Sequence, residues 1–270
     1  MIVRRLSEYC RLYFGLSFLG AMCLIWGALA VPLYPLLPAR YGEPLGRQII
    51  MRGFRLYLRV LVWIGACRID LSELDALRAE RSGLILAPNH PGLLDAVMVL
   101  SKFPNVACIM KSSLMDNIFL GSGARLAHYT RNDPPRRMIK EAVRALENGS
   151  FLLIFPEGTR TVAPPLNTCK PSIGLIAKRA RVPVQTLLIE TDSAFLSKGW
   201  PLFKRPSMPM TFRIRVGKRF EPPTGDAHAF AADIETYLRA ELQQSILQPP
   251  LIHAAPTTAP IALQERQPYA

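Results

Sequence analysis

Apolar positions near the start of the chain predict a membrane helix. After Arg11 the chain carries no charge until Arg40, and residues 12–30 are almost entirely apolar. A helix of that length would measure roughly 28 Å, close to the hydrocarbon thickness of a bilayer. The prolines that follow, the first of them Pro32, predict its end. We predict a retained membrane segment rather than a cleaved signal peptide, because the run is long for a signal peptide. Arginines flank both ends, so charge does not predict its orientation.

The pattern then changes to that of an amphipathic helix over residues 46–66. On a helical wheel Arg52, Arg55 and Arg59 fall on one side and Arg47 extends it, while bulky apolar residues lie largely elsewhere. A basic stripe beside an apolar face, directly after a membrane segment, favours a helix at the membrane interface. The alternative is a surface helix packed on the domain.

From residue 83 onward short apolar runs alternate with segments of helical periodicity. The runs 84–87, 107–110, 151–155, 184–190 and 211–216 predict strands, and 93–103, 135–147, 172–180 and 227–247 predict helices. Such alternation predicts an α/β fold, a mixed sheet covered by helices on both faces. We therefore predict membrane-anchoring helices over 1–66, an α/β domain over 67–248, and a disordered tail rich in Pro, Ala and Thr over 249–270.

Composition and charge narrow the classes of partner. Half of the 270 residues are hydrophobic, which excludes a disordered chain, and the formal net charge of +13 favours an anionic partner. That partner could be nucleic acid, an anionic lipid surface or a phosphorylated substrate, and the hydropathy favours the lipid surface. The five cysteines are odd in number and widely spaced, so we expect reduced thiols in a part that faces the cytoplasm. The four histidines show no metal-ligand spacing, so no metal is expected.

The first chemical signal is the segment Asn-His-Pro-Gly-Leu-Leu-Asp at residues 89–95, which directly follows a predicted strand. His90 and Asp95 are five residues apart, a spacing that in a regular helix would point their side chains in different directions. Pro91 and Gly92 allow a turn in which the Asp95 carboxylate reaches back to the imidazole. Such a pair suits the removal of a proton from an alcohol. The alternative is a histidine that caps a helix and an aspartate on its exposed face.

The second signal is Phe-Pro-Glu-Gly-Thr-Arg at residues 155–160, on a turn after another predicted strand. The Arg160 guanidinium can bind a phosphate with two hydrogen bonds. Glu157 can bind a hydroxyl or fix the arginine. The alternative is an ordinary salt-bridged turn.

Together the two segments resemble the glycerophosphate and lysophosphatidate acyltransferase superfamily, whose motifs are N-H-x4-D and F-P-E-G-T-R. The match at residues 89, 90, 95 and 155–160 is complete, and the resemblance extends over about residues 83–222. It implies a bacterial membrane-bound enzyme with the glycerolipid acyltransferase fold, His90 as general base and Asp95 as its partner. It also implies a substrate site containing Asn89, Lys111, Glu157, Gly158, Thr159 and Arg160.

Two further motifs of the superfamily are only partly present. In the second, Lys111 and Gly121 are kept, whereas Ser113 and Ile118 stand where a glutamate and a proline are usual, and Arg131 lies three positions early. In the fourth, Pro183 is kept, and Thr186 stands where a second proline is common. These departures leave the reaction type unchanged and weaken the assignment of lysophosphatidate as the acceptor.

The resemblance implies acyl transfer from a thioester to a lysophospholipid hydroxyl, with 1-acyl-glycerol-3-phosphate as acceptor and phosphatidic acid as product. The donor would be acyl-CoA or acyl-ACP, with no further cofactor, so acyl carrier protein is a candidate partner. A lyso-ornithine lipid or another lysolipid is an alternative acceptor. We expect the protein at the inner (cytoplasmic) membrane with its catalytic domain facing the cytoplasm.

Two other functions and one other mechanism are the alternatives. A basic nucleic-acid-binding protein fits the charge, but no helix-turn-helix, aromatic-studded strand or zinc motif accompanies the basic clusters. An inactive relative that only binds lipid does not explain the intact His90 and Asp95. A covalent route would need a nucleophile such as Cys169, and the resemblance argues against it.

Overall fold

The computed structural model describes residues 2–117 and 121–247. Two long helices come first, α1 (Ile2–Leu36) and α2 (Ala39–Trp63). The remaining elements, in chain order, are β1 (Cys67–Asp70), the 3-10 helix η1 (Ser72–Ala79), β2 (Leu84–Pro88), α3 (Leu94–Leu100), β3 (Val106–Met110), α4 (Ser112–Met115), α5 (Gly121–Leu126), β4 (Thr130–Arg131), α6 (Pro135–Glu147), β5 (Phe151–Leu153), α7 (Ser172–Ala180), β6 (Val184–Thr191), β7 (Met210–Phe220) and α8 (Ala227–Gln243). The predicted tail over 249–270 lies outside the described residues.

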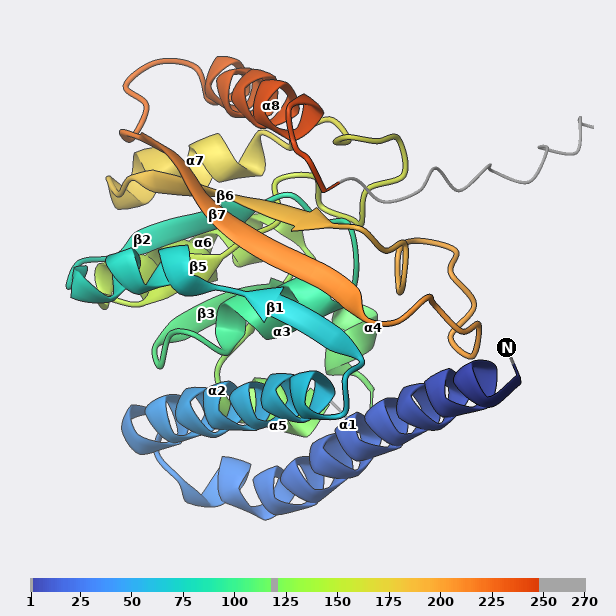
Figure 1. Cartoon of the computed structure of the whole chain (residues 1–270). Coiled ribbons are helices and arrows are strands. Elements are labelled where there is room, and N and C mark those ends of the chain that lie inside the picture. Colours follow the sequence, from blue (N-terminus) through green and yellow to red (C-terminus); the bar gives the residue numbers. More distant parts are fainter. Residues whose placement is uncertain (1, 118–120, 248–270) are drawn as a thin grey trace, which may run out of the picture.

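The strands form one mixed sheet in the order β1-β7-β6-β2-β5-β3-β4. All neighbours are parallel except β6 and β7, so β1 and β7 run against the other five strands. Residues of β2 and β6 are buried along their full length, as expected for parallel strands covered on both faces. The predicted fold class, a mixed α/β sheet with helices on both faces, is confirmed (Figure 1).

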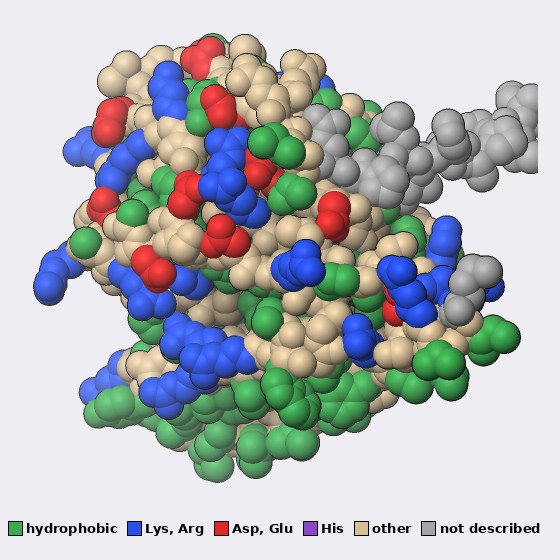
Figure 2. Space-filling model, viewed as in Figure 1, with side chains coloured by type: hydrophobic (Ala, Val, Ile, Leu, Met, Phe, Trp, Pro, Cys, Tyr) green, Lys and Arg blue, Asp and Glu red, His purple; other side chains and the backbone are tan. Residues whose placement is uncertain are grey.

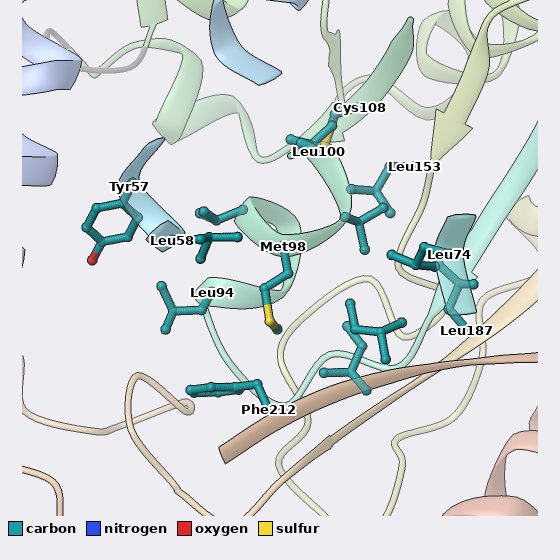
Figure 3. Packing of buried hydrophobic residues seen from close by; sticks show 14 of the residues in the cluster. Tyr57, Leu58, Leu74, Leu94, Met98, Leu100, Cys108, Leu153, Leu187 and Phe212 are labelled. Carbon is teal, nitrogen blue, oxygen red and sulfur yellow. The ribbon is translucent and has the colours of Figure 1, made fainter. Parts of the chain in front are cut away.

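Each face of the sheet carries its own hydrophobic core. Helices α6, α7 and α8 cover one face, where side chains such as Ile173 and Ile234 are fully buried. On the other face α3 packs against the strands, with α2 and α1 outside it (Figure 1). Figure 3 shows Tyr57 and Leu58 of α2 beside Leu94 and Met98 of α3 in this second core. The sheet and the two N-terminal helices therefore share a core, and the division predicted at residues 66 and 67 stays a prediction.

The N-terminal helices correct two sequence-based expectations. Helix α1 continues through Pro32 and Pro35 to Leu36, so the predicted stop at Pro32 was wrong. A proline removes one main-chain donor, and in an apolar helix neighbouring groups can compensate for that loss. The turn to α2 instead falls at Leu37 and Pro38.

Arg47 was expected on the exposed basic side of the second helix, and the structure buries it at 3% exposure. Its guanidinium donates to Ala127 O at 3.1 Å, Asn105 Oδ1 at 2.6 Å and Ser150 Oγ at 2.8 Å. Nη2 also pairs with Glu43 at 2.7 Å. Arg52 and Arg59 are exposed, as the amphipathic pattern predicts. A helical wheel cannot show the distant acceptors that turn Arg47 inward.

Candidate active site

The two sequence motifs lie at one edge of the sheet. Strands β2 and β5 are parallel neighbours, so the residues that follow them emerge at the same carboxyl edge. Strand β6 is the parallel neighbour of β2 on its other side. Asn89 ties this edge together, because its buried amide donates to Ile189 O at 3.0 Å and its Oδ1 accepts from Ile189 N at 2.7 Å. Asn89 thus joins β2 to β6, and both the nitrogen and the oxygen of its side-chain amide are hydrogen-bonded within the protein.

His90 and Asp95 form the expected contact. The His90 Nδ1 lies 2.8 Å from the Asp95 Oδ2, and the same oxygen accepts a bond of 2.7 Å from Gly92 N. Asp95 is the second residue of α3, and the turn before that helix brings its carboxylate back to the ring. Asp95 is buried, whereas the His90 side chain keeps 15% of its surface exposed. The pair therefore combines a sheltered carboxylate with a reachable imidazole.

The surroundings of Asp95 shift its pKa, and the surroundings of His90 fix the position of its ring. Burial raises the pKa of Asp95, while the hydrogen bonds from His90 and from Gly92 act in the opposite direction. The His90 ring stacks on Phe155, with centroids 3.7 Å apart and planes inclined by 17°. With Nδ1 bonded to the carboxylate as an N–H donor, Nε2 is the nitrogen left to accept a proton.

The buried Glu157 carboxylate connects the two motifs by hydrogen bonds. Its Oε1 accepts from His90 N at 2.8 Å, and its Oε2 accepts from Asn167 N at 2.8 Å. Thr161 Oγ1 lies 2.9 Å from both oxygens. Burial raises the pKa of this carboxyl, with the hydrogen bonds from Asn167, Thr161 and His90 opposing the shift. Glu157, expected in the substrate site, has both oxygens occupied by protein donors and positions the His90 backbone.

Gly158 and Thr159 form the exposed tip of the turn between Glu157 and Arg160. Gly158 has a φ of +69°, in the left-handed region that glycine adopts without strain. This conformation reverses the chain, and its amide donates to Phe155 O at 3.0 Å. Both residues are therefore exposed to solvent on the turn that follows β5.

Arg160 is half-buried and is partly committed to the protein. Its Nη1 donates to Leu196 O at 2.8 Å and to Ser197 O at 2.9 Å, in the connection between β6 and β7. These bonds use two of the five guanidinium N–H groups, and within the described residues Nε and Nη2 of Arg160 donate no hydrogen bond. The positive charge of Arg160 opposes the rise that burial causes in the pKa of Asp95. One side of the guanidinium therefore remains open to an anion.

The partly matched second motif lies farther along the same edge. Lys111 follows β3, which is two strands from β2, so about 10 Å separates the two strands. Its side chain is exposed, and no contact within the described ranges joins it to His90 or Arg160. Arg131 is engaged elsewhere, in a two-pronged pair with Asp116 at 2.8 and 3.1 Å. Ile118, named in that motif, lies outside the described residues.

Two further questions are whether the described residues could hold a metal ion and whether Cys169 could act as a nucleophile. Within residues 2–117 and 121–247, no group of three or more His, Cys, Asp or Glu side chains could hold a metal ion. Cys169 is buried in the core under α7 and α8, and burial raises the pKa of its thiol to about 12. Very little thiolate would form near neutral pH, so Cys169 is a poor nucleophile.

Comparisons with known proteins agree with this geometry. The sequence profile of the Acyltransferase family matches residues 68–190, which include both motifs. The resemblance to the acyltransferase superfamily that the motifs predict is confirmed over these residues. It is 23% identical over 207 residues to a 1-acyl-sn-glycerol-3-phosphate acyltransferase of Pseudomonas aeruginosa, covering 74% of this chain and 76% of the relative. It is 24% identical over 226 residues to an enzyme of that name from Limnanthes alba, covering 79% and 73%.

A solved structure shares the fold. The crystal structure of the 1-acyl-sn-glycerophosphate (LPA) acyltransferase from Thermotoga maritima matches with a TM-score of 0.67 at 20% identity. The match covers 91% of this chain and 99% of the other. An acyltransferase brings a base, an acyl donor and an acceptor together at one place, and the carboxyl edge of this sheet carries the His90–Asp95 pair as the candidate base.

Sequence reasoning missed several residues that shape this edge. Phe155 was recognised only as part of a motif, yet its ring fixes the plane of the imidazole. Thr161 and Asn167 complete the bonding of Glu157, and no sequence pattern marks them. Leu196 has a φ of +60°, rare for a branched residue, and its carbonyl accepts from Arg160 and from Leu93 N at 3.2 Å. Only the tertiary contacts identify it.

Proposed function

We propose that this acyltransferase moves a fatty acyl group from a thioester to the hydroxyl of 1-acyl-glycerol-3-phosphate, giving phosphatidic acid. The observation that carries the proposal is the 2.8 Å contact between His90 Nδ1 and the buried Asp95, at the open edge of an Acyltransferase-family domain. The acceptor follows the names of the relatives. The donor thioester would be carried by coenzyme A or by acyl carrier protein.

In this mechanism His90 acts as a general base. Nε2 takes the proton of the acceptor hydroxyl as its oxygen attacks the thioester carbonyl. The tetrahedral intermediate collapses with cleavage of the carbon–sulfur bond, and the imidazolium returns the proton to the leaving thiolate. Asp95 holds the tautomer and stabilises the positive charge that forms on the ring, and the stacked Phe155 holds its plane. Holding both reactants in register supplies much of the acceleration.

The acceptor phosphate would bind at the cationic side of the same edge. Arg160 has Nε and Nη2 available after its bonds to two main-chain carbonyls, an arrangement that suits two-pronged phosphate binding. Lys111 supplies a second exposed cation on the side of β3. Gly158 and Thr159 form the exposed turn beside Arg160. In this assignment the acceptor contacts these four residues, whereas Asn89 and Glu157 bond within the protein.

The proposal includes a place at the inner membrane with the catalytic domain facing the cytoplasm, and helix α1 supports the membrane association. Helix α1 is long and apolar enough to cross a bilayer. Its most apolar stretch of 18 residues has a mean hydropathy of 2.0, and only 17% of that stretch is buried. The domain contacts it from Arg11, which donates to Gly65 O, to Gly27, whose carbonyl accepts from Ser122. Because the domain lies along α1, we propose that this helix rests in the membrane surface rather than crossing it.

The test uses membranes that contain the full chain, labelled acyl-CoA and acyl-ACP, and a panel of acceptors. The panel includes 1-acyl-glycerol-3-phosphate, other lysophospholipids and a lyso-ornithine lipid, with the product identified by mass spectrometry. We expect labelled phosphatidic acid from the first acceptor. His90→Ala should lower the rate by about a hundredfold or more, because it removes the general base.

The matched control is His228→Ala, which removes an exposed histidine of α8. It should leave the rate unchanged. If a folded, membrane-bound His90→Ala variant works within a few-fold of wild type, the proposed base is wrong. Efficient acylation of a different acceptor would replace the proposed substrate and keep the reaction type.

A further inference from the structure

The connection between β6 and β7, residues 192–209, ends in an exposed apolar tip. Leu202 and Phe203 are consecutive and are 48% and 62% exposed. Two exposed lysines, Lys198 and Lys204, and the partly exposed Arg205 lie beside them. Large apolar side chains next to cations on an exposed turn are typical of segments that enter the headgroup region of a bilayer.

The tip is fastened to the N-terminal part of α1. The Phe203 ring stacks on Tyr13 with centroids 6.0 Å apart, and the Arg205 guanidinium lies 5.7 Å from the centre of the Tyr9 ring. Arg205 also pairs with Glu8, a carboxylate that is buried at 3% exposure. Figure 1 shows the connection descending from the sheet to the N-terminal end of α1. The tip therefore sits at a defined place beside the membrane helix.

The apolar surface is continuous from α1 to the tip. On the first four turns of α1 the exposed large apolar side chains are Ile2, Val3, Leu6, Tyr9, Tyr13 and Phe14. Arg4 and Arg5 are exposed among them and add cations to this surface. The stacking of Tyr13 on Phe203 joins this row to the tip. In Figure 2 apolar side chains line the side of the molecule formed by α1 and α2, with cations gathered above them. Such a rim of cations above an apolar band matches the layering of a bilayer surface.

The inner end of the same connection reaches the candidate active site. Leu196 O accepts from Leu93 N, just ahead of α3, at 3.2 Å and from Arg160 at 2.8 Å. Ser197 O accepts from Arg160 at 2.9 Å. Five residues separate Ser197 from Phe203 in sequence, so one short segment contacts both the arginine and α1.

We propose that Leu202 and Phe203 form a further membrane contact, in addition to the two N-terminal helices, that enters an anionic bilayer surface next to Arg160. The occupant is a lipid surface rather than a protein because the patch continues the exposed apolar face of α1 and is bordered by cations. The contact sets the active-site edge against the headgroups, where a lysolipid would enter. That last step rests on the proposed function, whereas the contact itself does not.

The contact is tested by quenching with brominated lipids. Full-length protein carrying Trp26→Phe and Trp63→Phe is reconstituted in vesicles of phosphatidylglycerol and phosphatidylcholine with brominated acyl chains. Phe203→Trp places a reporter in the tip, and the matched control, Ile246→Trp, places one at a 99% exposed apolar position beyond α8. Trp200 remains in both proteins and contributes equally. We expect the added emission at position 203 to be quenched at least about twofold more than that at 246.

Equal quenching at the two positions would overturn the proposal. A kinetic arm connects the contact with catalysis, using the pair Leu202→Ser/Phe203→Ser against Ile246→Ser. The double variant should show a several-fold higher KM for acceptor in vesicles and an unchanged KM for a short-chain acceptor dissolved as monomers. An inactive wild-type protein that still shows selective quenching would remove the proposed function and leave the membrane contact in place.

Discussion

At the scale of single residues, Arg160 both holds the connection between β6 and β7 and offers free N–H groups to an anion, and a substitution can separate these two roles. Nη1 holds the carbonyls of Leu196 and Ser197, and the remaining N–H groups are open to an anion. A lysine in its place can keep a charge but cannot reproduce a planar two-pronged contact.

Arg160→Lys should therefore lower kcat/KM by roughly ten- to hundredfold for a phosphate-bearing acceptor, equivalent to about 1.5–3 kcal/mol. The loss should be small for a neutral analogue such as a monoacylglycerol. Measuring both acceptors with both proteins separates phosphate binding from support of the loop. Equal losses would mean that Arg160 acts only through Leu196 and Ser197.

Glu157 offers a test of the pH dependence of stability. Burial raises its pKa above the ordinary value of 4.5, so the folded protein holds this proton more tightly than the unfolded chain does. The corresponding stabilisation is complete below about pH 4.5 and is lost as the pH rises through the raised pKa.

A glutamine at this position cannot ionise, so we expect the Glu157→Gln variant not to lose this stabilisation as the pH rises. Melting temperatures of both proteins between pH 5 and 8 should show the wild type losing stability relative to Glu157→Gln as the pH rises. Asp95 is present in both proteins and cancels in the comparison. Parallel pH curves would indicate that the carboxyl of Glu157 keeps its ordinary pKa.

At the scale of elements, helix α2 is anchored to the domain by a buried cation. Arg47 reaches Asn105 beside β3, Ser150 beside β5 and Ala127 after α5, so one side chain ties α2 to three separate segments. Gly46 allows the close approach, since a Cβ there would lie 2.8 Å from Ala127 N.

Arg47→Ala should destabilise the protein by about 3 kcal/mol, because it leaves several buried acceptors without a donor. Arg52→Ala, on the exposed side of the same helix, should change the stability by no more than about 0.5 kcal/mol. Thermal unfolding of both variants in the same detergent makes the comparison. Similar small losses would show that water replaces the guanidinium.

At the scale of the whole molecule, α1 serves the core as well as the membrane. Leu12 is 3% exposed in the same core as the sheet, and Phe18 stacks on Tyr57 of α2 with centroids 6.5 Å apart. Deleting residues 1–38 should therefore lower stability and weaken membrane binding together.

Some binding should remain in the deletion variant, because Arg52 and Arg59 stay exposed on α2 beside Trp63. That residual binding should fall as salt rises, since charge attraction is screened over about 8 Å at physiological ionic strength. Flotation with anionic vesicles at low and high salt measures it. A deletion variant that stays soluble at low salt would show that α2 serves only to pack on the domain.

The sequence by itself determined those features that depend on local pattern. Periodicity predicted α6 and α7 with the limits that the structure has, and the alternation of apolar runs predicted the mixed α/β class. It missed the short strands β1 and β4, which have four and two residues and form only by pairing with β7 and β3. The two motifs pointed to His90, Asp95 and Arg160 because their residue types and spacing are themselves local.

Tertiary structure alone decided the contacts between segments distant in the chain. The bond from His90 N to Glu157 spans 67 residues, and the bonds of Arg47 span 58 to 103. Such contacts bury Glu157 and Asn89, whose side chains bond to other parts of the protein. They also bring the Phe203 ring against the Tyr13 ring. A side chain's exposure and partners depend on how the sheet orders its strands, and local periodicity carries no record of that order.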